Sequence, residues 1–203
     1  IIDTAVEPVE PVKPRKLIIL ILSIFVGGFM GVLIALLRNM MRTGIKDSAQ
    51  IENVLNLPVY ATVPRSPVQE SRVQMLKKKK SIPILAITHS DDVAIESLRS
   101  IRTTIHFALA NAKNNIIAVS GPAPEVGKSF ISTNLAAIFA QSNKRVLLID
   151  ADLRRGYLHK YFNREVTPGF TEVMNSTISL DQAIFKTNVP NLDFLARGKN
   201  PGN

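Results

Sequence analysis

The chain contains no cysteine among its 203 residues. This absence excludes a disulfide framework and thiol catalysis, and it fits a largely reducing environment. Acidic residues are also scarce: 16 Asp and Glu stand against 25 Lys and Arg, which gives a formal net charge of +9 and a pI of about 10. A balance this basic indicates either nucleic acid or an anionic membrane as a partner.

Charge is missing altogether from Leu17 to Leu37, where Ser23 is the single polar side chain. A helix of this length spans roughly 30 Å, about one hydrocarbon core of a bilayer. A secretory signal would be shorter and would be followed by a small-residue cleavage site, which is absent here. The alternative is a buried core helix. We expect a transmembrane helix, and this favours the membrane over nucleic acid as the partner.

The phosphate-binding signal lies in residues 121–129, which read GPAPEVGKS. A β-branched run at 116–120 precedes them and a helix-like stretch at 130–141 follows, and strand, loop and helix are the setting of a phosphate-binding loop. Loop N–H groups and the helix dipole both favour an anion there. Lys128 would reach the β- and γ-phosphates and Ser129 would bind Mg²⁺. The alternative is an ordinary strand, turn and helix.

Two carboxylates follow a second apolar run. Residues 144–149 read as a buried parallel strand headed by basic residues, and the strand ends at Asp150 and Asp152. Ligands of open α/β sheets bind beyond such strand ends. Oxygen ligands suit Mg²⁺, and a carboxylate there could also take a proton from an attacking hydroxyl. The alternative is an N-cap or a solvated turn.

The two motifs, GPAPEVGKS and LLIDADLR, together resemble Walker A and Walker A′ of the bacterial tyrosine autokinases (BY-kinases) of polysaccharide export. That family has a loop of the form G-x-x-P-x-x-G-K-[ST], so Pro122, which breaks the strict phosphate-loop pattern, agrees with it. The related partition and division-site ATPases carry a signature Lys where this chain has Ala123. The resemblance runs from the apolar segment to about Gly198.

The resemblance implies an α/β fold, a truncated P-loop parallel sheet with helices on both faces, preceded by one transmembrane helix. The expected order of strand, helix, strand, helices and strand agrees. The implied cofactors are ATP and Mg²⁺. The catalytic and metal-binding groups would be Lys128, Ser129, Asp150 and Asp152. The ATP-binding residues would be Pro124, Glu125, Val126, Gly127, Lys128, Ser129 and Phe130.

A helix is predicted from Asp91 to Ala110 by its apolar spacing, with Ser90 or Asp91 as the N-cap. Glu96, Arg99 and Arg102 recur on it at three-residue spacing. An intrahelical ion pair would explain them. The spacing also resembles the family motif E-x-x-R-x-x-R, which implies an interface with a neighbouring subunit in a ring.

Tyr157 follows the acidic pair closely and resembles the internal regulatory tyrosine of the proteobacterial family members. Its phosphorylation would add about −1.5 to −2 charges near Asp150 and Asp152. We therefore hypothesise that phosphorylation displaces the Tyr157 ring and opens the site. The family's Walker B strand and C-terminal tyrosine cluster are expected beyond Asn203.

The predicted organisation has four parts, and we expect the chain to be a fragment of a longer protein. Residues 1–16 would end a periplasmic region, 17–37 would span the membrane, 38–90 would form a cytoplasmic juxtamembrane linker, and 91–203 would begin the kinase domain. ATP is cytosolic, so the kinase domain is placed in the cytoplasm at the bacterial inner membrane. Lys77–Lys80 would be a solvated linker or would contact anionic lipid.

The function implied is autophosphorylation on tyrosine, with control of exopolysaccharide or capsule chain length and export. The implied partners are further copies of the chain in a ring that phosphorylates in trans, the export machinery, a cognate tyrosine phosphatase and the lipid bilayer, without nucleic acid. Two alternatives remain: a membrane-tethered partition-type ATPase switch and a non-catalytic chain-length regulator. Further helices are expected at 47–55, 158–162, 170–174 and 180–185, and further strands at 58–64 and 192–195.

Overall fold

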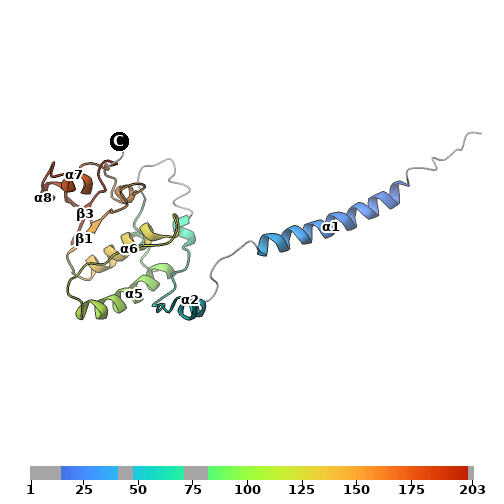
Figure 1. Cartoon of the computed structure of the whole chain (residues 1–203), viewed down its shortest axis with the longest axis horizontal. Helices are drawn as coiled ribbons and strands as arrows, with labels where there is room; N and C mark the ends of the chain where they lie inside the picture. The colour runs from blue at the N-terminus through green and yellow to red at the C-terminus, as the bar shows by residue number, and fades with distance from the viewer. Residues whose placement is uncertain (1–14, 41–47, 71–81, 201–203) are drawn as a thin grey trace, which may run out of the picture. The chain divides into compact units, whose positions relative to one another are not determined.

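The computed structural model of the protein describes residues 15–40, 48–70 and 82–200. The chain divides into two compact units, Ile1–Leu57 and Pro58–Asn203, and each is taken by itself below (Figure 1).

The first unit contains helix α1, Lys16–Met40, and the short helix α2, Ser48–Leu55. The sequence predicted both. From Lys16 to Asn39, α1 is long and apolar enough to cross a membrane, with a mean hydropathy of 2.9. Its described side chains are exposed on every side, which would be costly in water and is suited to lipid.

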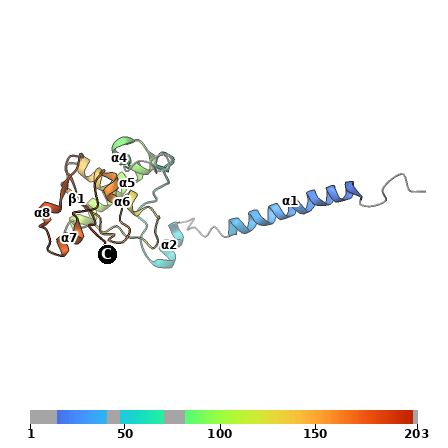
Figure 2. The ribbon, with the colours of Figure 1, turned by 90° about the horizontal axis from the view of Figure 1, so that it is seen from above.

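The second unit is built around two helices that lie side by side, α5 (Val93–Ala110) and α6 (Lys128–Gln141) (Figures 1 and 2). The N-cap of α5 is Asp92, whose Oδ1 accepts a hydrogen bond from the Ala94 N–H at 2.8 Å. The prediction of Ser90 or Asp91 was therefore wrong by one or two residues. An extended backbone at Asp92 brings its carboxylate within reach of the helix.

Within the described residues, three strands form one sheet in the order β1–β3–β2. Strand β1 (Val146–Ile149) runs parallel to β3 (Leu192–Leu195), as the α/β prediction required, and Val146 lies opposite Leu192. Strand β2 (Phe185–Lys186) is antiparallel to β3. The helix predicted at 180–185 is wrong at its end, because the backbone is already extended at Ile184.

Helix α6 packs against the sheet, and the core lies between them. Leu98 of α5, Ile138 of α6 and Phe194 of β3 are at most 1% exposed. Phe162 stacks on Phe194 with the ring centroids 4.5 Å apart. The remaining elements are α4 (Leu85–Thr88), the 3₁₀ helix η1 (Leu158–Tyr161), α7 (Phe170–Met174) and α8 (Leu180–Ala183).

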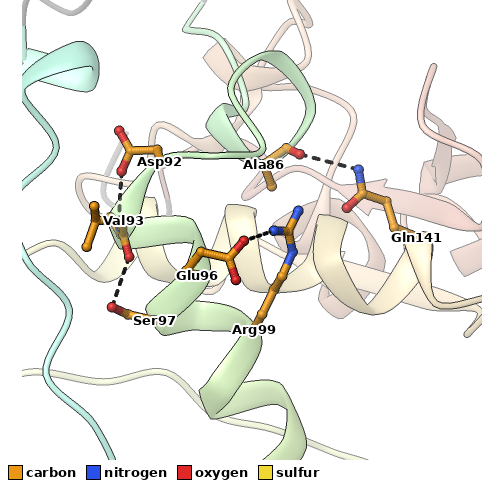
Figure 3. A network of polar contacts seen from close by, with 8 residues as sticks. Ala86, Asp92, Val93, Glu96, Ser97, Arg99 and Gln141 are labelled. Atoms are coloured by element: carbon orange, nitrogen blue, oxygen red, sulfur yellow. Dashed lines mark hydrogen bonds and ion pairs between the residues drawn. The ribbon is translucent and has the colours of Figure 1, made fainter.

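Hydrogen bonds from the buried Asn134 and the exposed Gln141 join α4 to α6. The side chain of Asn134 is fully buried; its Oδ1 accepts from the Ala86 N–H at 2.8 Å, and its Nδ2 donates to the Phe130 carbonyl at 2.8 Å. Gln141 donates from the end of α6 to the Ala86 carbonyl at 3.3 Å (Figure 3). Because buried polar groups are costly when unpaired, these bonds hold α4 on α6.

Part of the predicted linker packs within the second unit. The buried Ser66 hydroxyl donates to Asp92 Oδ2 at 2.6 Å and accepts from the Gln69 N–H at 3.2 Å. This ties residues 58–70 to the start of α5. Lys77–Lys80 lies outside the described residues, and so do residues 1–14 of the predicted periplasmic part.

Two predicted strands are not formed, at 116–120 and at 58–64, where the backbone has no strand assignment. A strand needs a neighbour to pair with, and β-branched composition alone does not supply one. Ile116 is 79% exposed and faces an open cavity described below. The prediction that the strand at 144–149 is buried is also wrong in part, because Leu147 and Ile149 are about 40% exposed at its open edge.

Candidate functional site

The phosphate loop bends sharply onto the start of α6. Gly127 has φ +100°, a left-handed conformation that glycine adopts without strain, and Glu125 has φ +60°. Lys128 opens the helix and folds back, donating from Nζ to the Ala123 carbonyl at 2.7 Å. The first N–H groups of α6 have no partner within the helix. This geometry can therefore cradle an anion, with the Lys128 ammonium above the loop.

The flanking loop residues shape that bend. A Cβ at Gly121 would lie 3.0 Å from Val126 Cγ2 and 3.3 Å from Lys128 Cγ and Cδ, so Gly121 lets the loop close. Pro124 is exposed, whereas Phe130 packs partly into the core. Their predicted part in ATP binding remains a prediction.

The acidic loop after β1 holds its two carboxylates differently. Asp150 is 3% exposed; its Oδ2 accepts from the Leu158 N–H at 3.0 Å and its Oδ1 from the Asp152 N–H at 3.3 Å. Asp152 is exposed, and its Oδ1 accepts from the Arg155 N–H at 2.9 Å. Burial raises the pKa of the Asp150 carboxyl above its usual value, and the N–H groups of Leu158 and Asp152 partly oppose this.

A cavity of about 1380 Å³ separates residues 115–120 from the open edge of β1. Four of the predicted functional groups lie on its wall: Lys128, Ser129, Asp150 and Asp152. Lys128 and Ser129 begin α6, and Asp150 and Asp152 follow the end of β1, the strand on which α6 packs. The predicted active-site groups therefore line one cavity.

These side chains suit Mg²⁺ bound together with a nucleotide. One hydroxyl and two carboxylates are hard oxygen donors, and Mg²⁺ needs few protein ligands when phosphates and water supply the rest. In the part of the chain that the structure describes, no group of three or more His, Cys, Asp or Glu could hold a metal by itself. The donor set thus fits a metal that arrives with phosphate.

Tyr157 lies beside the acidic loop and is 40% exposed. Its ring stacks on Tyr161 at 6.4 Å between centroids and 22° between planes. Tyr161 is 8% exposed. Burial raises the pKa of its hydroxyl, and the nearby Tyr157 raises it further by a smaller amount. Sequence reasoning did not find Tyr161, although two tyrosines four residues apart were a signal for contact across one turn.

Gly156 was also missed, and it supports the site directly. A Cβ there would lie 2.5 Å from the Asp152 carbonyl oxygen and would collide with both carboxylate oxygens of Asp150. Its N–H donates to the Asp152 carbonyl at 2.7 Å. Only glycine leaves room for Asp150 in this loop.

Gly156→Ala is therefore expected to displace Asp150 and to lower nucleotide-dependent activity by about tenfold or more, since misplaced reacting groups lose rate steeply. Gly28→Ala is a matched control, because a Cβ on that helix position meets no atom within 4 Å. Initial rates of ATP consumption by the two variants and the wild type in the full-length protein check this. Equal rates in all three would contradict the close contact.

The predicted interface residues lie on α5, away from the cavity. Glu96 and Arg99 form an ion pair within the helix (Figure 3). Glu96 is exposed and Arg102 is half-buried. The simpler account of the motif, an intrahelical pair, is thus present in the structure, and the interface with a second subunit stays a prediction.

Comparison with known proteins agrees with this geometry. Residues 117–182 match the family model "CobQ/CobB/MinD/ParA nucleotide binding domain", and residues 1–40 match "G-rich domain on putative tyrosine kinase". The whole chain is 72% identical to tyrosine-protein kinase ptk of Acinetobacter johnsonii and 38% identical to tyrosine-protein kinase etk of Escherichia coli K12, covering 28% and 29% of those proteins. Along its whole length the chain is thus similar to part of bacterial proteins that are named tyrosine-protein kinases.

Solved structures of bacterial tyrosine kinases show the same fold. The BceF tyrosine kinase domain is 44% identical with a TM-score of 0.74, and the match covers 79% of this chain and 65% of that one. For the kinase domain of E. coli ETK the identity is 38% and the TM-score 0.71, covering 79% and 63%. The P-loop α/β prediction is confirmed. The chain spans less than a third of the length of the curated relatives it matches.

Proposed function

We propose that the protein containing this chain is a membrane-anchored tyrosine autokinase that transfers the γ-phosphate of ATP to tyrosine. The observation that carries the proposal is the convergence of Lys128, Ser129, Asp150 and Asp152 on one cavity wall. Phosphoryl transfer depends mostly on positioning and on neutralising charge. A lysine, a hydroxyl and two carboxylates at one end of a sheet supply both.

Each group has a role that its position supports. The Lys128 ammonium, held above the phosphate loop, neutralises β- and γ-phosphate charge. Ser129, Asp150 and Asp152 are the oxygen donors that would hold Mg²⁺, which supplies further positive charge when bound. Asp150 is oriented by two N–H groups, and each of its oxygens keeps acceptor capacity for a metal or for the proton of an attacking hydroxyl.

The open edge of β1 indicates how the site is completed. Leu147 and Ile149 of β1 and residues 116–119 line the same cavity, and neither segment is paired along this side within the described residues. We infer that in the full-length protein another strand pairs there and adds the further acid expected of Walker B.

Membrane anchoring is supported by α1 and by the G-rich match at residues 1–40. We place the protein in the bacterial inner membrane with the kinase domain in the cytoplasm. A relative of 38% identity is named "Putative tyrosine-protein kinase in cps region" of Klebsiella pneumoniae. This name supports a role in polysaccharide chain length and export. As partners we propose the export machinery, a cognate phosphatase and further copies of the chain in a ring that phosphorylates in trans.

The fate of the γ-phosphate tests the activity. Full-length protein in lipid is incubated with Mg²⁺ and γ-labelled ATP, and label on protein tyrosine is separated from free phosphate. A kinase places the label on tyrosine. Free phosphate alone would instead indicate a partition-type ATPase switch, and neither product would indicate a non-catalytic chain-length regulator.

Replacing Tyr157 by Phe is expected to lower kinase activity toward an added substrate about tenfold, equal to about 1.4 kcal/mol of barrier. Phenylalanine has no hydroxyl to receive a phosphate. We hypothesise that this phosphate displaces the Tyr157 ring from Tyr161 and opens the site. Tyr60→Phe is the control, because Tyr60 is 70% exposed and lies in the segment before Ser66. Unchanged activity in the Tyr157→Phe enzyme would sink the hypothesis.

A further inference from the structure

Arg197 reaches from the end of β3 to the acidic loop. Its Nε donates to the Gly156 carbonyl at 3.1 Å and its Nη1 to the Leu153 carbonyl at 3.1 Å. These two carbonyls lie in the turn between Asp152 and Tyr157. One planar guanidinium therefore bridges both sides of the turn that carries the acids.

The backbone around Arg197 is itself anchored. Its carbonyl accepts from the Thr171 N–H at 3.0 Å and from the Thr171 Oγ1 at 2.9 Å. The neighbouring Ala196 carbonyl accepts from the Phe170 N–H at 2.7 Å, so the chain leaving β3 is bonded to the first turn of α7. A side chain on so fixed a backbone can hold another loop in place.

A second anchor lies two residues further on. The Glu172 carboxylate accepts from the Gly169 N–H at 2.8 Å and from the Lys199 N–H at 3.0 Å. Gly198, between Arg197 and Lys199, has φ +86°, and a Cβ there would collide with the Glu172 carboxylate. Hydrogen bonds at both ends of segment 196–199 therefore hold it against α7.

The loop needs such support from outside. The Asp150 N–H donates to the Leu195 carbonyl at 2.9 Å and so fixes the start of the loop on β3. The bonds of the turn that follows are local: Gly156 N–H to the Asp152 carbonyl, Arg155 N–H to Asp152 Oδ1, and Leu158 N–H to Asp150 Oδ2. Local bonds keep the shape of a turn but do not fix where the turn lies relative to the sheet. The bonds from Arg197 do, because Arg197 lies two residues beyond β3, the strand that pairs with β1.

We propose that Arg197 is a positioning residue of the active site: it clamps the acidic loop to the end of β3 so that Asp150 and Asp152 face the phosphate loop. The expected effect on rate rests on the proposed kinase function. The hydrogen bonds that clamp the loop do not depend on that function. Charge-assisted bonds to carbonyls are among the stronger hydrogen bonds, so their loss should free the turn.

The test compares Arg197→Met, Arg197→Lys and Lys199→Met in the full-length protein. Lys keeps the charge but its compact ammonium does not span two carbonyls as the guanidinium does. Lys199→Met is the matched control, since it removes a positive charge from an exposed side chain on the same segment. Thermal unfolding of all three shows whether each is folded.

The first readout is amide hydrogen exchange of a peptide covering residues 151–158. In Arg197→Met we expect exchange there to be roughly tenfold faster or more, with a smaller rise in Arg197→Lys. The peptide from α6 and the Lys199→Met protein should be unchanged. Unchanged exchange in Arg197→Met, or an equal rise in Lys199→Met, would overturn the clamp.

The second readout is the split between kcat and KM for autophosphorylation. Loss of the clamp should lower kcat about tenfold while KM for ATP stays within about twofold, because the phosphate loop is untouched. A matched loss of ATP affinity, with faster exchange in α6 as well, would assign Arg197 to general packing and overturn the proposal. If the wild type forms no phosphotyrosine, the proposed function fails, and the exchange comparison still decides the clamp.

Discussion

Lys128→Met is expected to lower autophosphorylation of the full-length protein by at least about a hundredfold while leaving it folded and in the membrane. Lys128 is the first residue of α6, and its ammonium lies over the loop on the Ala123 carbonyl. Methionine fills similar space without the charge. Removing a single positioned charge-stabilising group costs enzymes roughly 10²–10³ in kcat.

The initial rate of label transfer from ATP measures this effect, and Lys113→Met is its control. Lys113 is exposed, follows the end of α5 and is not among the residues that line the cavity. The unfolding midpoints of the two variants should agree with that of the wild type. A Lys128→Met protein that retains more than a tenth of wild-type activity would contradict the role given to the phosphate loop.

We expect Asp150→Asn to lower the autophosphorylation rate as strongly as Lys128→Met does, for two different reasons. The carboxylate accepts two backbone N–H groups, on different oxygens. An amide has one acceptor oxygen, so its NH₂ group must face one of those donors in a site that is 3% exposed. The substitution also removes the negative charge that would meet Mg²⁺ or take a proton.

We expect the Asp150→Asn protein to lose at least about a hundredfold in rate and about 1–3 kcal/mol in the free energy of unfolding. Asp181→Asn provides the comparison, because Asp181 is exposed on α8. Urea unfolding gives the stability and label transfer gives the rate. Equal rates in both variants would rule out a direct part for Asp150 in the chemistry.

Local signals in the sequence were sufficient for the long helices and for the positions of the two motifs along the chain. The uncharged run at 17–37 and the apolar spacing at 91–110 are set by the chain itself, and both became helices. The phosphate-loop and acidic motifs sit at a helix start and a strand end, so their meeting follows from parallel topology.

Features that depend on distant partners were not predicted. The run at 116–120 has strand composition, yet it forms no strand because nothing pairs with it among the described residues. Arg197 lies 41 residues from the carbonyl it binds at Gly156, and no spacing rule links them. Gly156 and Tyr161 stood next to residues already singled out, but their roles depend on side-chain contacts that only the folded loop creates.

The central claim is that Lys128 and its neighbours transfer phosphate to tyrosine, and one measurement tests it most directly. Full-length protein and its Lys128→Met variant are incubated with Mg-ATP, and phosphorylated residues are mapped by mass spectrometry. The account predicts phosphotyrosine, at Tyr157 or in the C-terminal tyrosine cluster expected from the family, in the wild type and its loss in the variant. Phosphotyrosine at equal levels in both proteins, or in neither, would contradict it.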